Sequence, residues 1–284
     1  RQMCIRDSFS PKPSLPQAFI TTDLSTRPAR TFVPGKKKQE TFPEFLTLLN
    51  LPSPKIEETK HGTTGRRLAL ANWITSPDNP LSTRVIVNRV WQKHFGQGLV
   101  TTANDFGFLG EPPTHPALLD FLSIYLIQND WKLKSLHRLI MLSDTYGQTA
   151  RQEPSAKAVL KDPQNQLLWR FPPRRLSAEQ IRDAMLFTSG ELKTKSGGSS
   201  VDGNSPHRSV YVKKRRNSPD RILSAFDAPA GFSSSSERLD TTTSTQALLL
   251  RNNPWPHARA QAMAKKFAKS ESTRSTISLS LIHI

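Results

Sequence analysis

The sequence has almost no cysteine and no long apolar segment. Its single thiol, Cys4, excludes an internal disulfide, a zinc site built from cysteines and the C-x-x-C-H attachment of c-type haem. No apolar run reaches the roughly 18 residues that a membrane-spanning helix needs. We therefore expect no membrane span, no metal site and no cofactor in this chain.

Apolar residues are also scarce, while basic residues and proline are plentiful. Hydrophobic residues make up 36% of the 284 positions, and there are 22 prolines. The 40 Lys and Arg against 23 Asp and Glu give a net charge of +17. A surface of this kind attracts phosphates, acidic polysaccharides or anionic membranes without specifying which. The composition predicts a packed core that carries long polar loops.

The two ends do not fit the pattern of the remainder. The segments RQMCIRDS and SLSLIHI resemble translated adapter sequence at the ends of metagenomic contigs. We expect residues 1–8 and 277–284 to be non-native ends of an internal fragment. Residues 9–64 are predicted to form an extended arm and linker with a short helix at 41–50. The compact domain is expected over 65–276 and is truncated.

Apolar residues recur at helical spacing in most of the compact part. Asn79 followed by Pro80 favours a helix start, and Ser177 with Gln180 forms an S-x-x-Q capping box. The alternating RSVYVKKRR predicts a strand at 209–213. We predict a mainly α fold, an irregular multi-helix domain with long loops and a minor β element. Its core helices are expected at 66–75, 80–95, 116–128, 133–143 and 177–192.

The loop 96–114 joins two of these helices and is unusually long for a compact domain. Arg84 and Asn88 lie one turn apart in the apolar sector of the helix 80–95, and a buried guanidinium needs partners. Asn104 and Asp105, at the centre of the loop, are the nearest amide and carboxylate in sequence. We predict a structural clasp in which Asp105 or Asn104 contacts Arg84 or Asn88, with a ligand-binding or catalytic loop as the alternative.

Two histidines extend this candidate site. His94 falls in the buried sector of its helix, and His115 stands at the start of the next one. No histidine pair has metalloprotease spacing, so hydrogen-bonded core or capping roles are favoured over metal binding. The candidate polar cluster or ligand-binding residues are Arg84, Asn88, His94, Asn104, Asp105 and His115.

The strongest electrostatic feature is the basic stretch after the predicted strand. Lys213, Lys214, Arg215 and Arg216 are candidates for polyanion binding, with a solvated strand end as the alternative interpretation. No serine lies in a nucleophile elbow, and no glycine segment has phosphate-loop spacing. No catalytic residue is therefore assigned.

Several segments together carry a family resemblance. They include GRRLALANWITSPDNPLSTRVIVNRVWQKHFGQGLVTTANDFGFLGEPPTHPALLDFL, WKLKSLHRLIMLSDTYGQ, RRLSAEQIRDAMLFTSGEL, RSVYVKKRRN and TTTSTQALLLRNNPW. The chain resembles the planctomycete-specific PSD-one domain family over about residues 27–269, in collinear order. This is a family of domains of unknown function, so the resemblance transfers no catalytic residue.

The resemblance does imply a context for the chain. Members usually form the C-terminal part of large exported proteins that carry an upstream cytochrome-c-like domain. It implies an exported or periplasmic protein, with haem only in an upstream domain that this chain lacks. The expected function is an accessory or binding domain linked to electron transfer or polysaccharide processing, with an acidic polysaccharide or the parent protein's other domains as partners. A non-specific nucleic-acid or polyanion binder, and an enzyme with its site at 84–115, remain open alternatives.

Overall fold

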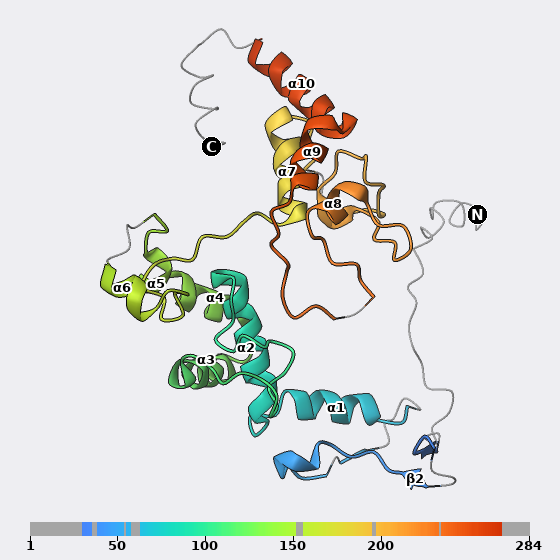
Figure 1. The fold of residues 1–284 in the computed structure, drawn as a ribbon. Helices are drawn as coiled ribbons and strands as arrows, with labels where there is room; N and C mark the ends of the chain where they lie inside the picture. The colour runs from blue at the N-terminus through green and yellow to red at the C-terminus, as the bar shows by residue number, and fades with distance from the viewer. Residues whose placement is uncertain are drawn as a thin grey trace, which may run out of the picture. The chain divides into compact units, whose positions relative to one another are not determined.

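The computed structural model describes residues 30–35, 39–53, 55–57, 63–151, 156–194, 197–232 and 234–268. The expected non-native ends and Cys4 lie outside this range. The described part contains ten α-helices and one two-stranded sheet, which confirms a mainly α fold with a minor β element (Figure 1). The chain divides into two compact units, residues 1–83 and 84–284, which are described separately.

The first unit contains more structure than an extended arm. Strand β1 (Thr31–Phe32) pairs antiparallel with β2 (Glu40–Thr41), and each threonine hydroxyl donates to the other's carbonyl. The helix predicted at 41–50 is present only as the 3-10 turn η1 (Thr47–Leu49). The prolines at 43 and 52 bracket this segment and leave room for a single turn.

Helix α1 (Arg66–Ile74) appears where it was predicted, but it is not buried. The side chains of Leu70 and Ile74 on this helix are exposed. Trp73 is half-buried and stacks on Phe45 with 4.9 Å between ring centroids. A single aromatic pair therefore anchors α1, rather than a continuous stripe.

The four core helices predicted for the second unit are confirmed, and five further helices appear in its described part. Helix α2 begins before the unit boundary, and the Asn79 side chain caps it by accepting from the backbone N–H groups of Leu81 and Ser82. The helices are α2 (Pro80–Phe95), α3 (Pro116–Gln128), α4 (Leu133–Met141), α5 (Asp144–Gly147), α6 (Ala156–Lys161), α7 (Ala178–Ser189), α8 (Arg221–Ala225), α9 (Ser244–Asn252) and α10 (Pro254–Ala268).

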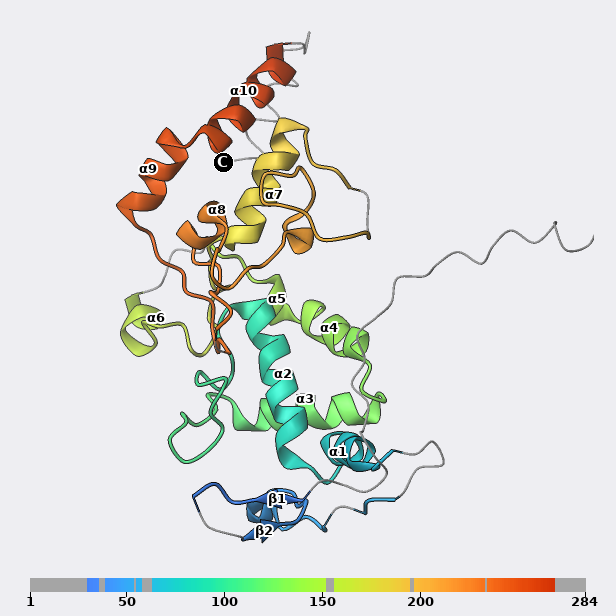
Figure 2. The same ribbon diagram turned by 90° about the vertical axis from the view of Figure 1, so that its right-hand side faces the viewer.

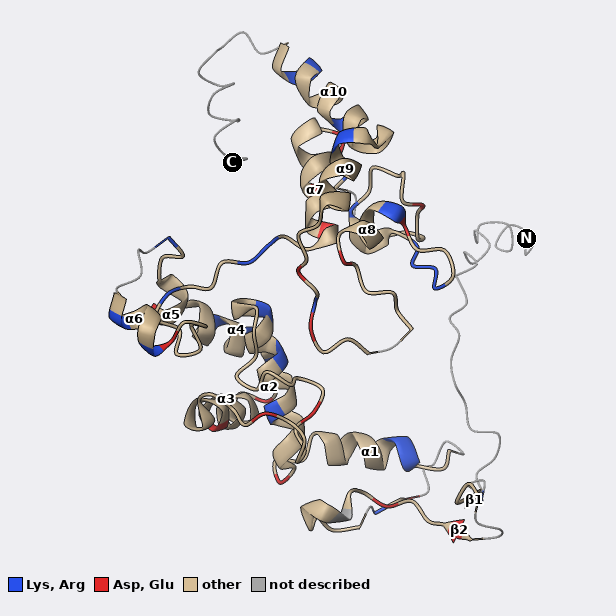
Figure 3. Cartoon of the chain, in the orientation of Figure 1, with Lys and Arg blue, Asp and Glu red and all other residues tan. Residues whose placement is uncertain are grey.

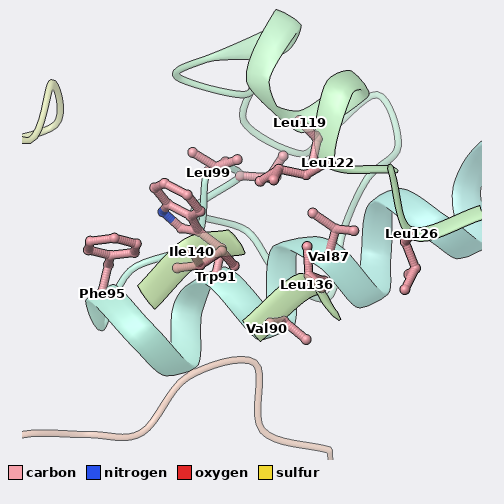
Figure 4. Close-up of a cluster of buried hydrophobic side chains, with 11 residues drawn as sticks. Val87, Val90, Trp91, Phe95, Leu99, Leu119, Leu122, Leu126, Leu136 and Ile140 are labelled. Carbon is pink, nitrogen blue, oxygen red and sulfur yellow. The ribbon is translucent and has the colours of Figure 1, made fainter. Parts of the chain in front are cut away.

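A first hydrophobic core forms where α3 and α4 pack on α2 (Figure 4). Trp91 stacks on Phe95 with ring centroids 4.3 Å apart, and the neighbouring apolar side chains fill the space around them. Full burial of such side chains stabilises the fold by about 1.5–3 kcal/mol each. The buried members are Val87, Val90, Trp91, Phe95, Leu99, Val100, Leu119, Leu122, Leu126, Leu136 and Ile140.

The loop after α2 is clasped to it by Asn88, which is fully buried. The Asn88 amide donates to the Val100 carbonyl at 2.9 Å and accepts from the Val100 N–H at 2.8 Å. Gly98 makes this approach possible, because a Cβ there would lie 2.7 Å from the Asn88 amide atoms. The carbonyl of the preceding residue, Leu99, accepts from the Thr114 N–H at 2.8 Å. The loop is thus closed at both ends.

The predicted partner of Arg84 was wrong. Arg84 is 35% exposed and pairs with Asp120 on α3 at 2.7 Å. Asp105 instead accepts from the Gly107 N–H in a tight turn, and Asn104 accepts from Arg89 at 2.6 Å. The packing of α3 on α2 brings Asp120 to Arg84, so the nearest carboxylate in space comes from the next helix.

A second core forms where α7, α8 and α10 meet (Figure 2). Its buried side chains are Ala178, Leu186, Ile222, Phe226 and Trp255. The capping box of Ser177 and Gln180 is confirmed at the start of α7. A second helix boundary lies at Asn253, whose side chain accepts from the Trp255 N–H at 2.8 Å. Pro254 and Pro256 lie in the first turn of α10, where proline is tolerated.

The guanidinium of Arg182 on α7 is fully buried and organises the polar loop beside this core. It donates to the carbonyls of Gly203, Ser205 and His207. The neighbouring Asp183 accepts from both the N–H and the hydroxyl of Ser209, at 2.8 and 2.7 Å. The backbone carbonyls of this loop therefore accept from the Arg182 guanidinium and not from a neighbouring strand.

The strand predicted at 209–213 was wrong for this reason. The segment forms the 3-10 turn η2 (Ser209–Tyr211), followed by a single bridge between Val212 and Val201. Because Asp183 holds Ser209, the backbone turns where an alternating apolar pattern would favour an extended strand.

We expect Asn88→Ala to destabilise the protein by about 2–4 kcal/mol, because it leaves the buried N–H and carbonyl of Val100 without partners. Asn104→Ala removes an amide of the same kind at an exposed position and should cost about 1 kcal/mol or less. Urea unfolding of the two variants measures the difference. Equal losses would contradict a clasp at Asn88.

We expect Arg182→Met to cost about 3–5 kcal/mol, since three loop carbonyls and Asp183 lose a buried cationic donor. Arg208→Met is the matched control, because Arg208 contacts the same Asp183 at 3.8 Å with a side chain that is 62% exposed. That exposed pair should contribute about 0.5 kcal/mol. Thermal melts that fall equally in both variants would refute this role of Arg182.

Candidate functional site

A cleft of about 1090 Å³ opens in the second unit beside α2. Its floor includes Val90, Phe95 and Phe171 from the first core and its rim. One wall is the connector that leads into α7, and the other is the loop that contains Ser235 and Ser236. The Gln92 side chain donates to the Ser236 carbonyl at 3.2 Å and ties that loop to α2.

Basic residues from three segments line this cleft. Figure 3 marks Lys and Arg positions in blue along α2 and along the connector that leads into α7. Only two carboxylates, Glu237 and Asp240, line it. The five cationic lining residues are Arg89, Lys93, Arg174, Arg175 and Arg238. The excess of positive charge in a concave wall focuses a field that favours anions.

One of these cations is fixed by the end of α2. Arg174 donates to the Lys93 carbonyl at 2.8 Å, which places its charge at the negative end of the helix dipole. Its side chain lies over Gly96, where a Cβ would approach the Arg174 Cδ to 2.7 Å. Gly96 also has a φ of +89°, a backbone conformation that favours glycine. Both this conformation and the space that Arg174 occupies therefore favour glycine at this position.

Two others are held by carboxylates of the second core. Arg238 forms a two-pronged pair with Glu179, with both N–O distances at 3.1 Å, and this pair contributes to holding the pKa of Glu179 below its ordinary value. Arg175 contacts Asp227 at 3.4 Å, and its Nη2 atom is buried with no hydrogen-bond partner among the described residues. Lys93 is exposed, and its ammonium has no ion pair within the described segments. The cleft therefore holds both fixed and available donors.

A histidine pair adjoins the cleft at the end of α2. His94 Nε2 and His137 Nδ1 lie 2.7 Å apart, and the His94 ring meets the edge of Tyr146 at 5.5 Å between centroids. His137 lines the cleft. Burial lowers the pKa of His94, and the charges of His137 and Arg174 lower it further. His94 therefore remains neutral at pH values where an ordinary histidine begins to take up a proton.

The structure distributes the six predicted cluster residues over separate contacts. Asn88 and Asn104 hold the loop, Arg84 pairs with α3, and Asp105 shapes a turn. His115 is the N-cap residue of α3 but bonds only the adjacent Thr114 hydroxyl, at 3.0 Å. His94 alone adjoins the cleft, through its bond to His137.

The predicted polyanion-binding residues lie elsewhere in the second unit. Lys213, Lys214, Arg215 and Arg216 are exposed, and the first three line a shallow pocket of about 530 Å³. Lys213 is 3.6 Å from Asp202. These residues remain a candidate secondary patch for anions.

The sequence pattern did not single out the cleft cations. They lie far apart in the chain, and only the pair Arg174 and Arg175 after two prolines forms a local signal. Within the described segments, no three His, Cys, Asp or Glu residues are grouped as metal ligands. No helix in that part is long and apolar enough to cross a membrane.

The comparison with protein families identifies the chain. Residues 66–283 match PSD1, described as a protein of unknown function (DUF1553). The match covers most of the chain, so the protein belongs to this family, as the sequence resemblance indicated. No curated protein and no solved structure matches the chain.

The lowered pKa of His94 predicts a pH dependence of stability. Below about pH 6.5 the unfolded chain binds a proton at this residue that the folded protein resists, so the free energy of unfolding falls with acid. We expect the loss of melting temperature between about pH 7.5 and 5.5 to be smaller in His94→Gln than in the parent protein. His257→Gln, at an exposed position, should keep the parent's loss. Identical pH profiles for all three proteins would contradict this assignment.

Proposed function

We propose that this protein is a non-catalytic accessory domain that binds an acidic polysaccharide in the cleft beside α2. The observation that carries the proposal is the convergence of five cationic side chains on one concave surface with only two carboxylates. At about 1090 Å³ the cleft is at least as large as the roughly 300–1,000 Å³ pockets that hold small ligands. A segment of a polymer fits this size better than a single small molecule.

The other groups of the lining suit a sugar chain. Gln97, Ser177, Gln180 and Ser235 add polar side chains to the lining. The capping box leaves the Gln180 NH2 group to donate, and the bond from Ser235 to the Glu237 carbonyl leaves the Ser235 hydroxyl oxygen to accept from sugar hydroxyls. The aromatic rings of the floor belong to the core, and Phe95 is only 2% exposed. Single-stranded nucleic acids usually bind where bases stack on accessible aromatic rings. A glycan is therefore favoured over a nucleic acid.

The proposal includes the context that the sequence resemblance implies. We propose an exported or periplasmic parent protein of planctomycete type that processes polysaccharide, with haem confined to an upstream domain and no cofactor in this chain. Of the two contexts, polysaccharide processing is favoured over electron transfer because the charged cleft suits an anionic polymer. No nucleophile and base share a hydrogen bond among the described cleft residues, so we assign no catalytic role.

We expect chondroitin sulfate to bind with micromolar or weaker affinity that falls steeply with salt, as polyanion contacts do. Arg89→Gln with Lys93→Gln should weaken binding about tenfold, as the loss of two partly exposed charge contacts predicts. The slope of log affinity against log salt should also shrink by about one unit per lost contact. Calorimetric titration at several salt concentrations measures both quantities.

Lys265→Gln with Lys266→Gln, on α10, is the matched control that removes the same charge outside the cleft. It should bind chondroitin sulfate nearly as the parent does. Equal weakening in both double variants would contradict a cleft site and indicate only the net charge. Tighter binding to duplex DNA that is lost on Lys213→Ala, Lys214→Ala, Arg215→Ala and Arg216→Ala would favour the nucleic-acid alternative, and cleavage of the glycan would refute a non-catalytic role.

A further inference from the structure

In the histidine pair at the end of α2, His137 of α4 has one ring nitrogen left for a ligand. His137 uses Nδ1 to contact His94 Nε2, so its remaining ring nitrogen is Nε2. Because His137 belongs to the lining of the cleft, this ring is accessible to a bound molecule. The ring of its partner His94 contacts Tyr146, which in turn contacts Phe95 of the first core.

The groups around the pair are basic or neutral. Arg174 acts electrostatically on His94 and donates to the carbonyl of the adjacent Lys93. Tyr146 from α5 contacts the His94 ring, and Lys134 and Arg138 lie within one turn of His137 on α4. No carboxylate is among the described groups that shift the pKa of His94. Glu237 and Asp240 line the same cleft, and Asp144 lies on α5, which packs against α4, but none of the three is among the described groups that act on His94.

We propose that His137, as an imidazolium, binds one sulfate or carboxylate group of the polysaccharide together with Lys93 and Arg174. This subsite rests on the proposed function of the cleft and names the group that the α2 end of the cleft recognises. The anion accepts from His137 Nε2–H, while His137 Nδ1–H donates to the neutral His94 Nε2. Proton uptake by His137 and binding of the anion favour each other.

The pair is suited to hold a single additional proton. When both histidines are neutral, one hydrogen lies between the two nitrogens that are 2.7 Å apart. One more proton on His137 keeps this hydrogen bond and strengthens it, because the donor becomes charged. A second proton on His94 would place two N–H groups against each other. Burial, His137 and Arg174 all disfavour that state, which is consistent with the lowered pKa of His94.

The test measures binding of chondroitin sulfate to the whole chain at about pH 7.5 and 5.5, a range that spans the ordinary histidine pKa. The sulfate groups keep their charge over this range, so the protein alone titrates. We expect affinity to rise about fivefold in acid, within the usual size of coupling between two sites. Calorimetry in two buffers of different ionisation enthalpy should show uptake of a proton on binding near the histidine pKa.

His137→Gln keeps a side chain that can donate to an anion but cannot take up a proton in this range. It should abolish both the acid enhancement and the proton uptake, whereas His257→Gln should retain them. Hyaluronate carries carboxylates and no sulfate, so it separates the two anionic groups. If acid raises the affinity for chondroitin sulfate alone, the subsite binds sulfate. If acid raises the affinity for both glycans, the subsite accepts either group.

The outcomes distinguish this subsite from the cleft itself. If the parent protein binds neither glycan at either pH, the proposed function fails. If it binds but its pH dependence is unchanged in His137→Gln, the cleft stands and the histidine subsite is refuted. The calorimetric proton count of the parent protein decides the matter even if His137→Gln does not fold, because binding without proton uptake overturns the proposal.

Discussion

The fold of the second unit depends on one side chain that replaces backbone partners. Asn88 supplies both a donor and an acceptor to Val100, so the segment after α2 can lie against the helix with no strand beside it. This contact buries Leu99 and Val100 in the first core and leaves the Leu99 carbonyl directed to Thr114, just before α3. The position of α3, and with it the pairing of Arg84 with Asp120, follows from this amide.

The same constraint reaches the cleft through the loop. Once the loop is closed, Asn104 stands where it accepts from Arg89, and Arg89 lines the cleft wall. At the other end of α2, Gly96 leaves the space that the Arg174 side chain occupies. The closed loop therefore positions Arg89, and the space at Gly96 positions Arg174, so that two of the cleft's cations depend on α2 and the loop that follows it.

Local patterns predicted the helices well and the long-range polar contacts poorly. The stripes and caps of α2, α3, α4 and α7 depend on residues within a few positions, so the sequence alone defines them. The strand predicted at 209–213 failed because Arg182 and Asp183, far away in the chain, hold that segment in a turn. The partner of Arg84 was missed for a similar reason, since packing of α3 decides which carboxylate comes near.

The candidate site was hardest to predict because its members share no segment. Arg89, Arg174 and Arg238 lie in α2, a connector and a loop, and each is ordinary in its local sequence. What brings them together is the pairing of each with a different element: Asn104, the Lys93 carbonyl and Glu179. A search for charge clusters in sequence instead singles out Lys213 to Arg216, where four basic residues are adjacent.

Fixed and available cations have different roles in such a cleft. Arg238 and Arg175 already face Glu179 and Asp227, so much of their charge is balanced within the protein and they chiefly hold the walls in place. Lys93 remains exposed, and Arg174 has only a carbonyl as its bonded partner, so neither charge is neutralised by a carboxylate there. Unbalanced charge therefore concentrates at the C-terminal end of α2, beside His137. If an anionic polymer lies in the cleft, its most strongly held group belongs at this end, because available positive charge and a lining histidine coincide there.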